Sequence, residues 1–143
     1  MHVKQLSIFL ENAKGSLLKL TKLFGEAGID LVALSIADTE QYGIVRCIVS
    51  DAVKAAAVVR EAGYSMRQTD VLAACVPDAP GGLAKVLQML SDADISVEYL
   101  YSLVRAKGDS AAVIFQLADL DKGIALLKAG GIELLNSEQL HAL

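Results

Sequence analysis

The sequence repeats itself, and this repeat constrains the fold more than any other feature of the chain. The stretch ENAKGSL (Glu11 to Leu17) has the same shape as PDAPGGL (Pro77 to Leu83), and Gly15 and Gly81 lie 81 − 15 = 66 positions apart. The segments that follow, LLKLTKLFGEAGIDL and LAKVLQMLSDADISV, match mainly at their apolar positions. Because apolar positions are those that build a core, we infer that one folded unit has been duplicated.

The hydrophobic spacing changes in a regular order within the first copy. Alternation of apolar and polar residues is typical of strands, whereas spacing of three and four residues is typical of helices. Acidic residues and glycines mark the expected starts and ends of the helices. The expected order is strand, helix, strand, strand, helix, strand, over residues 3–10, 17–27, 31–37, 44–50, 51–63 and 64–70.

The second copy predicts the same elements with a small insertion. Asp51 matches Asp119 with an offset of 119 − 51 = 68, so two residues have been added. The added residues fall in RAKGDS, which predicts a hairpin turn. A final strand is expected in IELLNSEQL, and the strand VLAACVP follows Asp70 directly, which leaves almost no linker between the copies.

This order of elements is the split βαβ arrangement of ferredoxin-like domains. The predicted fold class is therefore α+β, with two ferredoxin-like βαββαβ repeats whose first and third strands lie in the middle of each sheet. Both helices of a repeat are expected on one face of its sheet. The uncovered face carries few charges, and exposed apolar residues there favour association, so we expect at least a homodimer.

Composition narrows the possible functions. A hydrophobic content of 54% over 143 residues supports a sizeable core in both copies. The formal charge of −4, from 13 basic and 17 acidic residues, argues against a nucleic-acid or membrane partner. No window approaches the apolar length of a membrane helix, and no signal peptide is evident. Cys47 and Cys75 lie in apolar runs and are expected to be buried thiols in the cytoplasm.

The chemistry-bearing residues do not form a motif for catalysis, metal binding or a cofactor. His2 and His141 lie near the chain ends with no cysteine or carboxylate motif beside them, and we expect both to be exposed. No serine lies in a Gly-x-Ser-x-Gly elbow. The glycines of PGG are not followed by the lysine and hydroxyl of a phosphate-binding loop. We therefore expect a protein that is not an enzyme.

The two glycine turns are the best candidates for a binding site. Each joins a first strand to a first helix, where backbone N–H groups lack intrahelical partners and carry partial positive charge. Glycine has no Cβ, so a ligand can approach the backbone closely. An acceptor side chain, Asn12 or Asp78, stands beside each turn. Donors for a carboxylate beside an acceptor for an ammonium group suit a free amino acid, although the same residues also suit ordinary helix capping.

These turns resemble the signature of the ACT domain family. DAPGGL with DADIS, and NAKGSL with EAGIDL, follow the order of that signature, and two such domains would cover residues 1–69 and 70–143. The resemblance implies a regulatory protein that binds a small effector, most often an amino acid, and that acts on a partner enzyme. It also implies that the sheets join edge to edge with their helices on one face.

The resemblance also implies where an effector is bound. Contacts are expected from the turn and the helix start of each copy, and from the second strand of a neighbouring ACT unit across an interdomain interface. The implied ligand-binding residues are Asn12, Gly15, Ser16, Leu17, Leu31, Val32, Asp78, Gly81, Gly82, Leu83, Val97 and Glu98. The first copy departs from the signature, because Lys14 stands where the second copy has Pro80 and Asn12 stands where it has Asp78.

Three alternatives compete with a regulatory amino-acid-binding protein. A small ferredoxin-like hydrolase of the acylphosphatase type needs an arginine or an acid–base pair at the site, and neither glycine turn contains an arginine. An RNA-binding module stacks bases on aromatic residues of the central strands, where this chain offers Phe115 alone. A purely structural or oligomerisation module would use the same turns only as helix caps.

Overall fold

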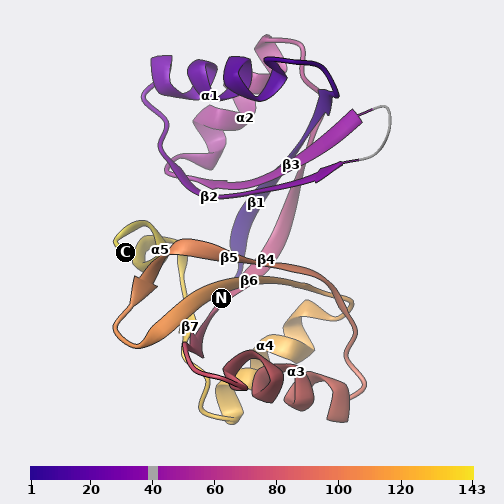
Figure 1. The fold of residues 1–143 in the computed structure, drawn as a ribbon, viewed down its shortest axis with the longest axis vertical. Coiled ribbons are helices and arrows are strands. Elements are labelled where there is room, and N and C mark those ends of the chain that lie inside the picture. Colours follow the sequence, from indigo (N-terminus) through magenta and orange to yellow (C-terminus); the bar gives the residue numbers. More distant parts are fainter. Residues whose placement is uncertain (39–41) are drawn as a thin grey trace. The chain divides into compact units, whose positions relative to one another are not determined.

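The computed structural model describes residues 1–38 and 42–143, without the side chains of residues 104–107. The chain divides into two compact units, which are Lys4–Thr69 and the combination of Met1–Val3 with Asp70–Leu143. Each unit is an antiparallel sheet with its two longer helices on one side (Figure 1). The predicted α+β class with two repeats is thus confirmed.

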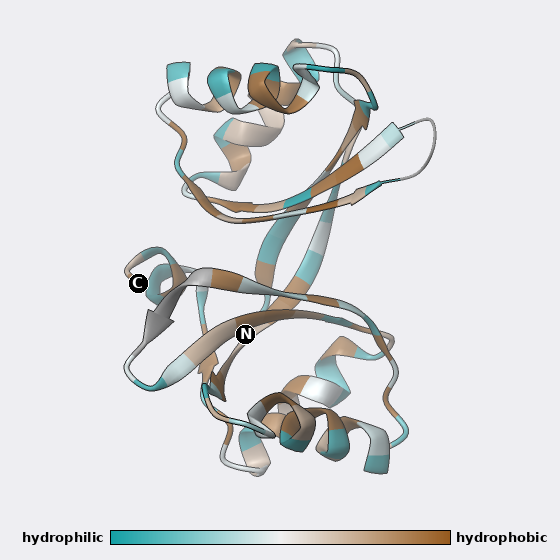
Figure 2. Ribbon diagram, viewed as in Figure 1, coloured by the Kyte–Doolittle hydropathy of each residue, from teal (hydrophilic) through white to brown (hydrophobic). Residues whose placement is uncertain are grey.

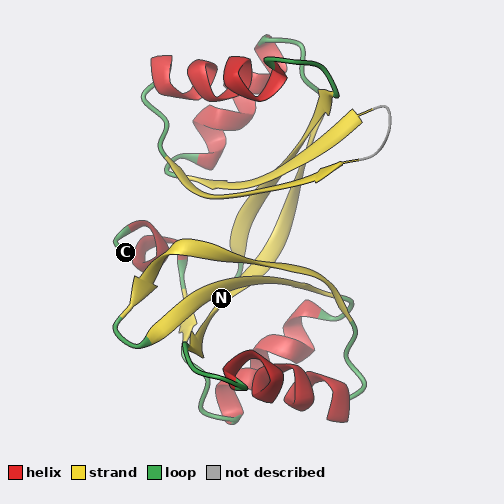
Figure 3. Cartoon of the chain, viewed as in Figure 1, coloured by secondary structure: helices red, strands yellow, loops and turns green. Residues whose placement is uncertain are grey.

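The first unit contains the six predicted elements in the predicted order. Its sheet runs β2-β3-β1, and the amide of Phe9 in β1 donates to the carbonyl of Ser65, just before β4, at 3.0 Å. The two helices lie together on one face of the sheet (Figure 3). The turn expected in DTEQYG lies largely outside the described residues. The elements are β1 (Val3–Glu11), α1 (Ser16–Glu26), β2 (Leu31–Asp38), β3 (Tyr42–Val49), α2 (Ala52–Glu61) and the start of β4 (Met66–Pro77).

The second unit repeats this arrangement, with strand order β7-β4-β6-β5. The hairpin turn predicted in RAKGDS is confirmed, since Gly108 separates two paired strands and has a positive φ of 60°. In both units the first and third strands pair directly, as predicted. The elements after β4 are α3 (Gly82–Asp92), β5 (Val97–Lys107), β6 (Ser110–Leu117), α4 (Leu120–Ala129), β7 (Leu134–Leu135) and α5 (Ser137–His141).

Each unit has its own apolar core between sheet and helices. In the first unit Leu6 faces Cys47 across paired strands, and Leu20 and Phe24 of α1 cover them. The matching positions Val86 and Leu90 of α3 are buried in the second core. Figure 2 shows apolar residues along the strands and in patches on the helices. Burial of one such side chain contributes about 1.5 to 3 kcal/mol, so the repeated apolar positions account for the repeated fold.

The two cysteines are buried and form no disulfide, as the sequence predicted. Burial raises the pKa of the Cys47 thiol to about 12, so this thiol stays protonated at neutral pH. A protonated buried thiol is a poor nucleophile and a poor metal ligand. Within the described residues, no helix has the length and apolar character needed to cross a membrane.

The end of the chain differs from the prediction. Only Leu134–Leu135 of IELLNSEQL forms a strand, and the remainder turns into α5. The Asn136 side chain accepts from the Gln139 amide at 2.8 Å, while the Gln139 side chain accepts from the Asn136 amide at 2.9 Å. This reciprocal capping box starts a helix where continued alternation had predicted a strand.

Candidate functional site

The first helix of each unit starts without a side-chain cap. Gly15 and Gly81 precede α1 and α3 in the left-handed conformation, with φ of 87° and 83°, and no described side chain caps either helix there. The second helices differ, because Asp51 accepts from the Lys54 amide at 3.0 Å and Asp119 accepts from the Lys122 amide at 3.1 Å. The absence of a cap is therefore specific to the two glycine turns among these four helices.

The missing caps leave donors unpaired at both helix starts. The amides of Leu17 and Leu18 in α1, and those of Leu83 and Ala84 in α3, make no hydrogen bond with any described residue. Unpaired first-turn amides carry the positive end of the helix dipole. They can donate to an anion such as a carboxylate, at about 0.3 to 1 kcal/mol when exposed.

A small hollow lies beside the start of α1 and brings three of the predicted residues together. Its volume is about 90 Å³, and its lining includes Asn12, Ser16 and Leu17. The hollow also contains Asp38 of β2, which the sequence analysis missed. Gly43 makes room for this carboxylate, because a Cβ there would lie 3.1 Å from Asp38 Oδ1. The unpaired amides can donate to the carboxylate of a zwitterion, and the acidic residue beside them can pair with its ammonium group.

Several predicted residues of the first unit do not line this hollow. Gly15 forms the turn itself, and Leu31 is half-buried at the start of β2. Val32 is 6% exposed, so its side chain is not accessible to a ligand.

The second unit places its predicted residues in two separate groups. Asp78 and Gly81 are exposed at the turn, and no described residue makes a hydrogen bond with the Asp78 carboxylate. Gly82 is buried, and Leu83 packs against the core. The backbone of Gly82 packs tightly against Pro77, since a Cβ on Gly82 would lie 2.0 Å from the Pro77 carbonyl oxygen.

Val97 of β5 lies at the other end of α3, beside a hollow of about 260 Å³. The same hollow is lined by Asp94, which has a positive φ of 58°. Asp94 takes the position of Gly28 in the first unit, since 94 − 28 = 66, and aspartate is one of the few side chains that tolerate this conformation. Glu98, also predicted, is exposed next to Val97. DADIS belongs to the signature noted in the sequence analysis, which did not predict that Asp94 lines a hollow.

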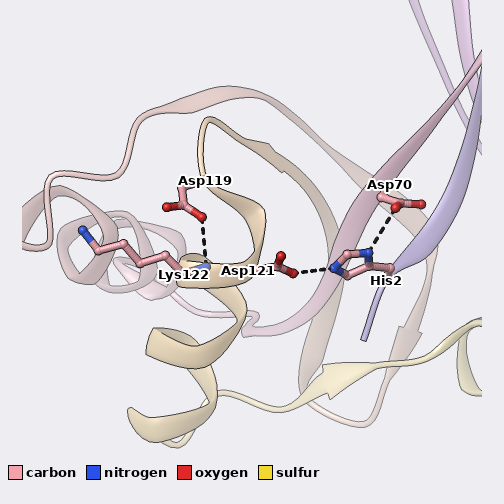
Figure 4. A network of polar contacts seen from close by, with 5 residues as sticks. All are labelled: His2, Asp70, Asp119, Asp121 and Lys122. Carbon is pink, nitrogen blue, oxygen red and sulfur yellow. Dashed lines mark hydrogen bonds and ion pairs between the residues drawn. The ribbon is translucent and has the colours of Figure 1, made fainter.

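A second polar cluster lies at the N-terminus, where His2 bridges two carboxylates (Figure 4). Its Nδ1 is 3.1 Å from Asp70 Oδ2 and its Nε2 is 2.7 Å from Asp121 Oδ1. The predicted exposure of His2 is confirmed, and its two carboxylate partners were not predicted. Sequence separations of 68 and 119 residues hid these contacts.

Hydrogen bonds to Asp121 and then Asp70 raise the pKa of His2 above its ordinary value. Only an imidazolium can donate from both ring nitrogens at once, which agrees with this direction. The histidine lies between the two acids, so the three groups do not converge on a common point as metal ligands do. Within the described part of the chain, no group of histidine, cysteine and acidic residues could hold a metal ion.

Comparison with known proteins gives one family and several similar structures. A family model described as an ACT domain pair matches residues 1–143. The crystal structure of protein BT0572 from Bacteroides thetaiotaomicron is 40% identical, covering 100% of this chain and 98% of that chain with a TM-score of 0.93. No match was found among curated proteins.

More distant structures share the fold. The ligand-free regulatory subunit of aspartate kinase from Thermus thermophilus is 17% identical, with 91% of each chain covered and a TM-score of 0.64. The regulatory subunit of aspartate kinase from Thermus flavus is 14% identical, with 88% of each chain covered and a TM-score of 0.62.

The difference in capping predicts different effects of two equivalent-looking aspartates on stability. Asp119→Ala removes a cap and lowers the free energy of unfolding by about 1 kcal/mol. Asp78→Ala changes it by less than about 0.5 kcal/mol, because this carboxylate caps nothing. Urea titrations of both variants beside the parent protein measure the two effects. Equal losses would show that Asp78 seals its helix start, contrary to the geometry.

The His2 cluster predicts a pH dependence with a defined sign. Because the folded-state pKa is raised, the stabilisation is fully present below about pH 6.5 and is lost as pH rises through the folded pKa. Thermal midpoints of the parent protein and His2→Gln should therefore differ more at about pH 6 than at about pH 9. An NMR titration should place the His2 pKa lower in Asp121→Asn than in the parent protein. A pH-independent midpoint difference, or an unchanged His2 pKa, would contradict the bridging contacts.

Proposed function

Because the chain belongs to the ACT domain pair family, we propose that it is a non-catalytic regulatory protein whose effector is a free amino acid. The main support for this proposal is the pair of uncapped helix starts, with unpaired amides at Leu17 and Leu18 and at Leu83 and Ala84. An amino-acid carboxylate accepts from these amides, and its ammonium group binds the acidic or amide side chain beside the turn. Asn12 and Asp78 are the predicted acceptors.

The hollow at the first turn supports this proposal but encloses only part of a ligand. Ligand pockets usually have volumes of about 300 to 1,000 Å³, and this one has about 90 Å³. Its wall includes Ile36, which is 44% exposed despite its apolar side chain. A neighbouring ACT unit that covers Ile36 would complete the wall. We therefore propose a homodimer in which the ligand lies at an interdomain interface, with Leu31, Val97 and Glu98 facing it.

Regulation requires an output, and the similar proteins suggest its kind. Two of them are regulatory subunits of aspartate kinase. We propose that this chain likewise acts on a separate partner enzyme, through an effector affinity that differs between two states of the assembly.

We also propose that the protein is cytoplasmic, because two buried cysteines that form no disulfide suit a reducing compartment.

The hydrolase alternative is less well supported than effector binding. Acyl or phosphoryl transfer needs a positioned acid–base pair or an arginine at the reacting group. The described residues around the first hollow supply Glu11, Asn12, Ser16 and Asp38 but no histidine or arginine. A purely structural module would give the same fold, and it would differ by showing no ligand affinity.

Isothermal titration calorimetry against the common amino acids tests the proposal. We expect at least one to bind, and we expect Asp78→Ala or Asn12→Ala to weaken that binding about tenfold, equal to about 1.4 kcal/mol. Asp119→Ala is the matched control, since it removes a carboxylate from the other helix start of the same unit and should leave affinity unchanged.

Two results would contradict the proposal. Absence of heat and of any thermal shift with every amino acid would favour a structural module. Binding that is unchanged in both turn variants would remove the turns from the site. Light scattering on the saturated sample checks the dimer, and a monomer would contradict the shared wall.

A further inference from the structure

A larger hollow adjoins the small one at Glu11 and Ser16 and extends to residues outside the predicted site. Its volume is about 360 Å³, within the range of about 300 to 1,000 Å³ typical of ligand pockets. It is formed by the end of β1, the first turns of α1 and the segment that leads from α2 into β4. Its lining includes Glu11, Ser16, Lys19, Ala62, Tyr64 and Ser65.

A second hollow of about 280 Å³ extends this one along α1. The two share Lys19, Ala62 and Tyr64, so they form one continuous groove. The extension adds Lys22, Leu23 and Glu26 of α1. Leu23 lies one turn beyond Lys19 on the same helix face. Leu23 and Tyr64 both pack against the first core, which gives this part of the groove an apolar floor.

The groove contains opposite charges that the protein does not pair with each other. Glu11 comes from β1 and Lys19 comes from α1, both are exposed, and neither forms an ion pair or side-chain hydrogen bond with a described residue. The hydroxyls of Ser16 and Tyr64 likewise bond no described partner. Such a set offers a cation, a carboxylate and neutral donors around one apolar floor.

We propose that this groove binds a single α-amino acid with an apolar side chain. The ligand carboxylate pairs with Lys19 and accepts from the Ser16 hydroxyl, and its ammonium group pairs with Glu11. The side chain lies over Ala62 and Tyr64 toward Leu23. The inference rests on the proposed amino-acid-binding function and adds to it a site that needs only residues of the first unit.

The second unit carries different residues at most of the positions that form this groove. Offsets of 66 and 68 replace Glu11 by Pro77, Ser16 by Gly82 and Tyr64 by Ile132. The Pro77 carbonyl lies against Gly82, so no serine side chain fits there.

The position of Ala62 has also changed in the second copy. It corresponds to Gly130, where a Cβ would lie 2.1 Å from the terminal methyl of Met89. Met89 thus fills the space on this side of α3. Lys85 keeps the chemistry of its counterpart, Lys19. One groove site per chain is therefore expected.

Calorimetric titration of the full chain with L-leucine, L-phenylalanine and glycine tests the inference. Leucine or phenylalanine should bind about tenfold more tightly than glycine, because their side chains bury apolar area on Tyr64. Lys19→Ala should weaken this binding about tenfold, and Lys85→Ala, the matched change in the second unit, should not. Glu11→Gln and Tyr64→Ile should each weaken it, with circular dichroism confirming that each variant is folded.

Ligand analogues test the assigned charges directly. Leucinol lacks the carboxylate and 4-methylpentanoate lacks the ammonium group, so each should lose about tenfold in affinity to the parent protein. Lys19→Ala should affect leucine more than leucinol, and Glu11→Gln should affect leucine more than 4-methylpentanoate.

The outcomes separate this inference from the proposed function. Binding that Lys19→Ala weakens but Asp78→Ala and Asn12→Ala leave intact supports the groove and overturns the turn sites. Binding that the turn variants weaken but Lys19→Ala, Glu11→Gln and Tyr64→Ile leave intact overturns the groove and keeps the proposed function. Equal effects of Lys19→Ala and Lys85→Ala overturn the groove as a site of the first unit. No binding of any amino acid overturns both.

Discussion

The candidate turn sites depend on how the chain enters the first helix of each repeat. Gly15 and Gly81 take left-handed conformations and place no side chain at the cap position, so the first-turn amides have no partner among the described residues. The second helices, which aspartates cap, show what the same fold does when a helix only needs to be stable. A cap contributes about 1 kcal/mol. Its absence at the same place in both repeats therefore forgoes stability where a ligand can supply the missing acceptor.

The two repeats have kept their cores and changed their surfaces. Leu20 and Phe24 in one repeat and Val86 and Leu90 in the other fill equivalent buried positions. Around the first helix the repeats diverge, because Gly82 packs against the Pro77 carbonyl where the first repeat has Ser16 and open space. Packing constrains the buried positions, whereas the surface of each repeat was free to acquire separate binding properties.

Much of the fold could be predicted from the sequence, because alternation and helical spacing are local signals. Pairing of the first and third strands followed from the order of elements alone. The C-terminal helix was missed, since the Asn136–Gln139 capping box overrides the alternation that suggested a strand. The bridge from His2 to Asp70 and Asp121 could not be predicted, because no local pattern marks contacts between residues so far apart in sequence.

The site was only partly predictable for the same reason. The glycine turns identified Asn12, Ser16 and Leu17, which the fold brings together. Asp38 joins them from a different strand, and its place depends on the pairing of β2 with β3 at Gly43. The groove beside Lys19 combines β1, α1 and the segment after α2, and no motif in any one of these segments indicates it.

The central claim is that the first-turn amides of α1 and α3 are donors for an amino-acid carboxylate. The most direct measurement is an NMR titration that follows the backbone amides of Leu17, Leu18, Leu83 and Ala84 while amino acids are added. The account predicts saturable downfield proton shifts at one or both pairs, with the Lys54 and Lys122 amides, already capped, unmoved. Saturable binding that leaves all four first-turn amides unshifted would contradict it.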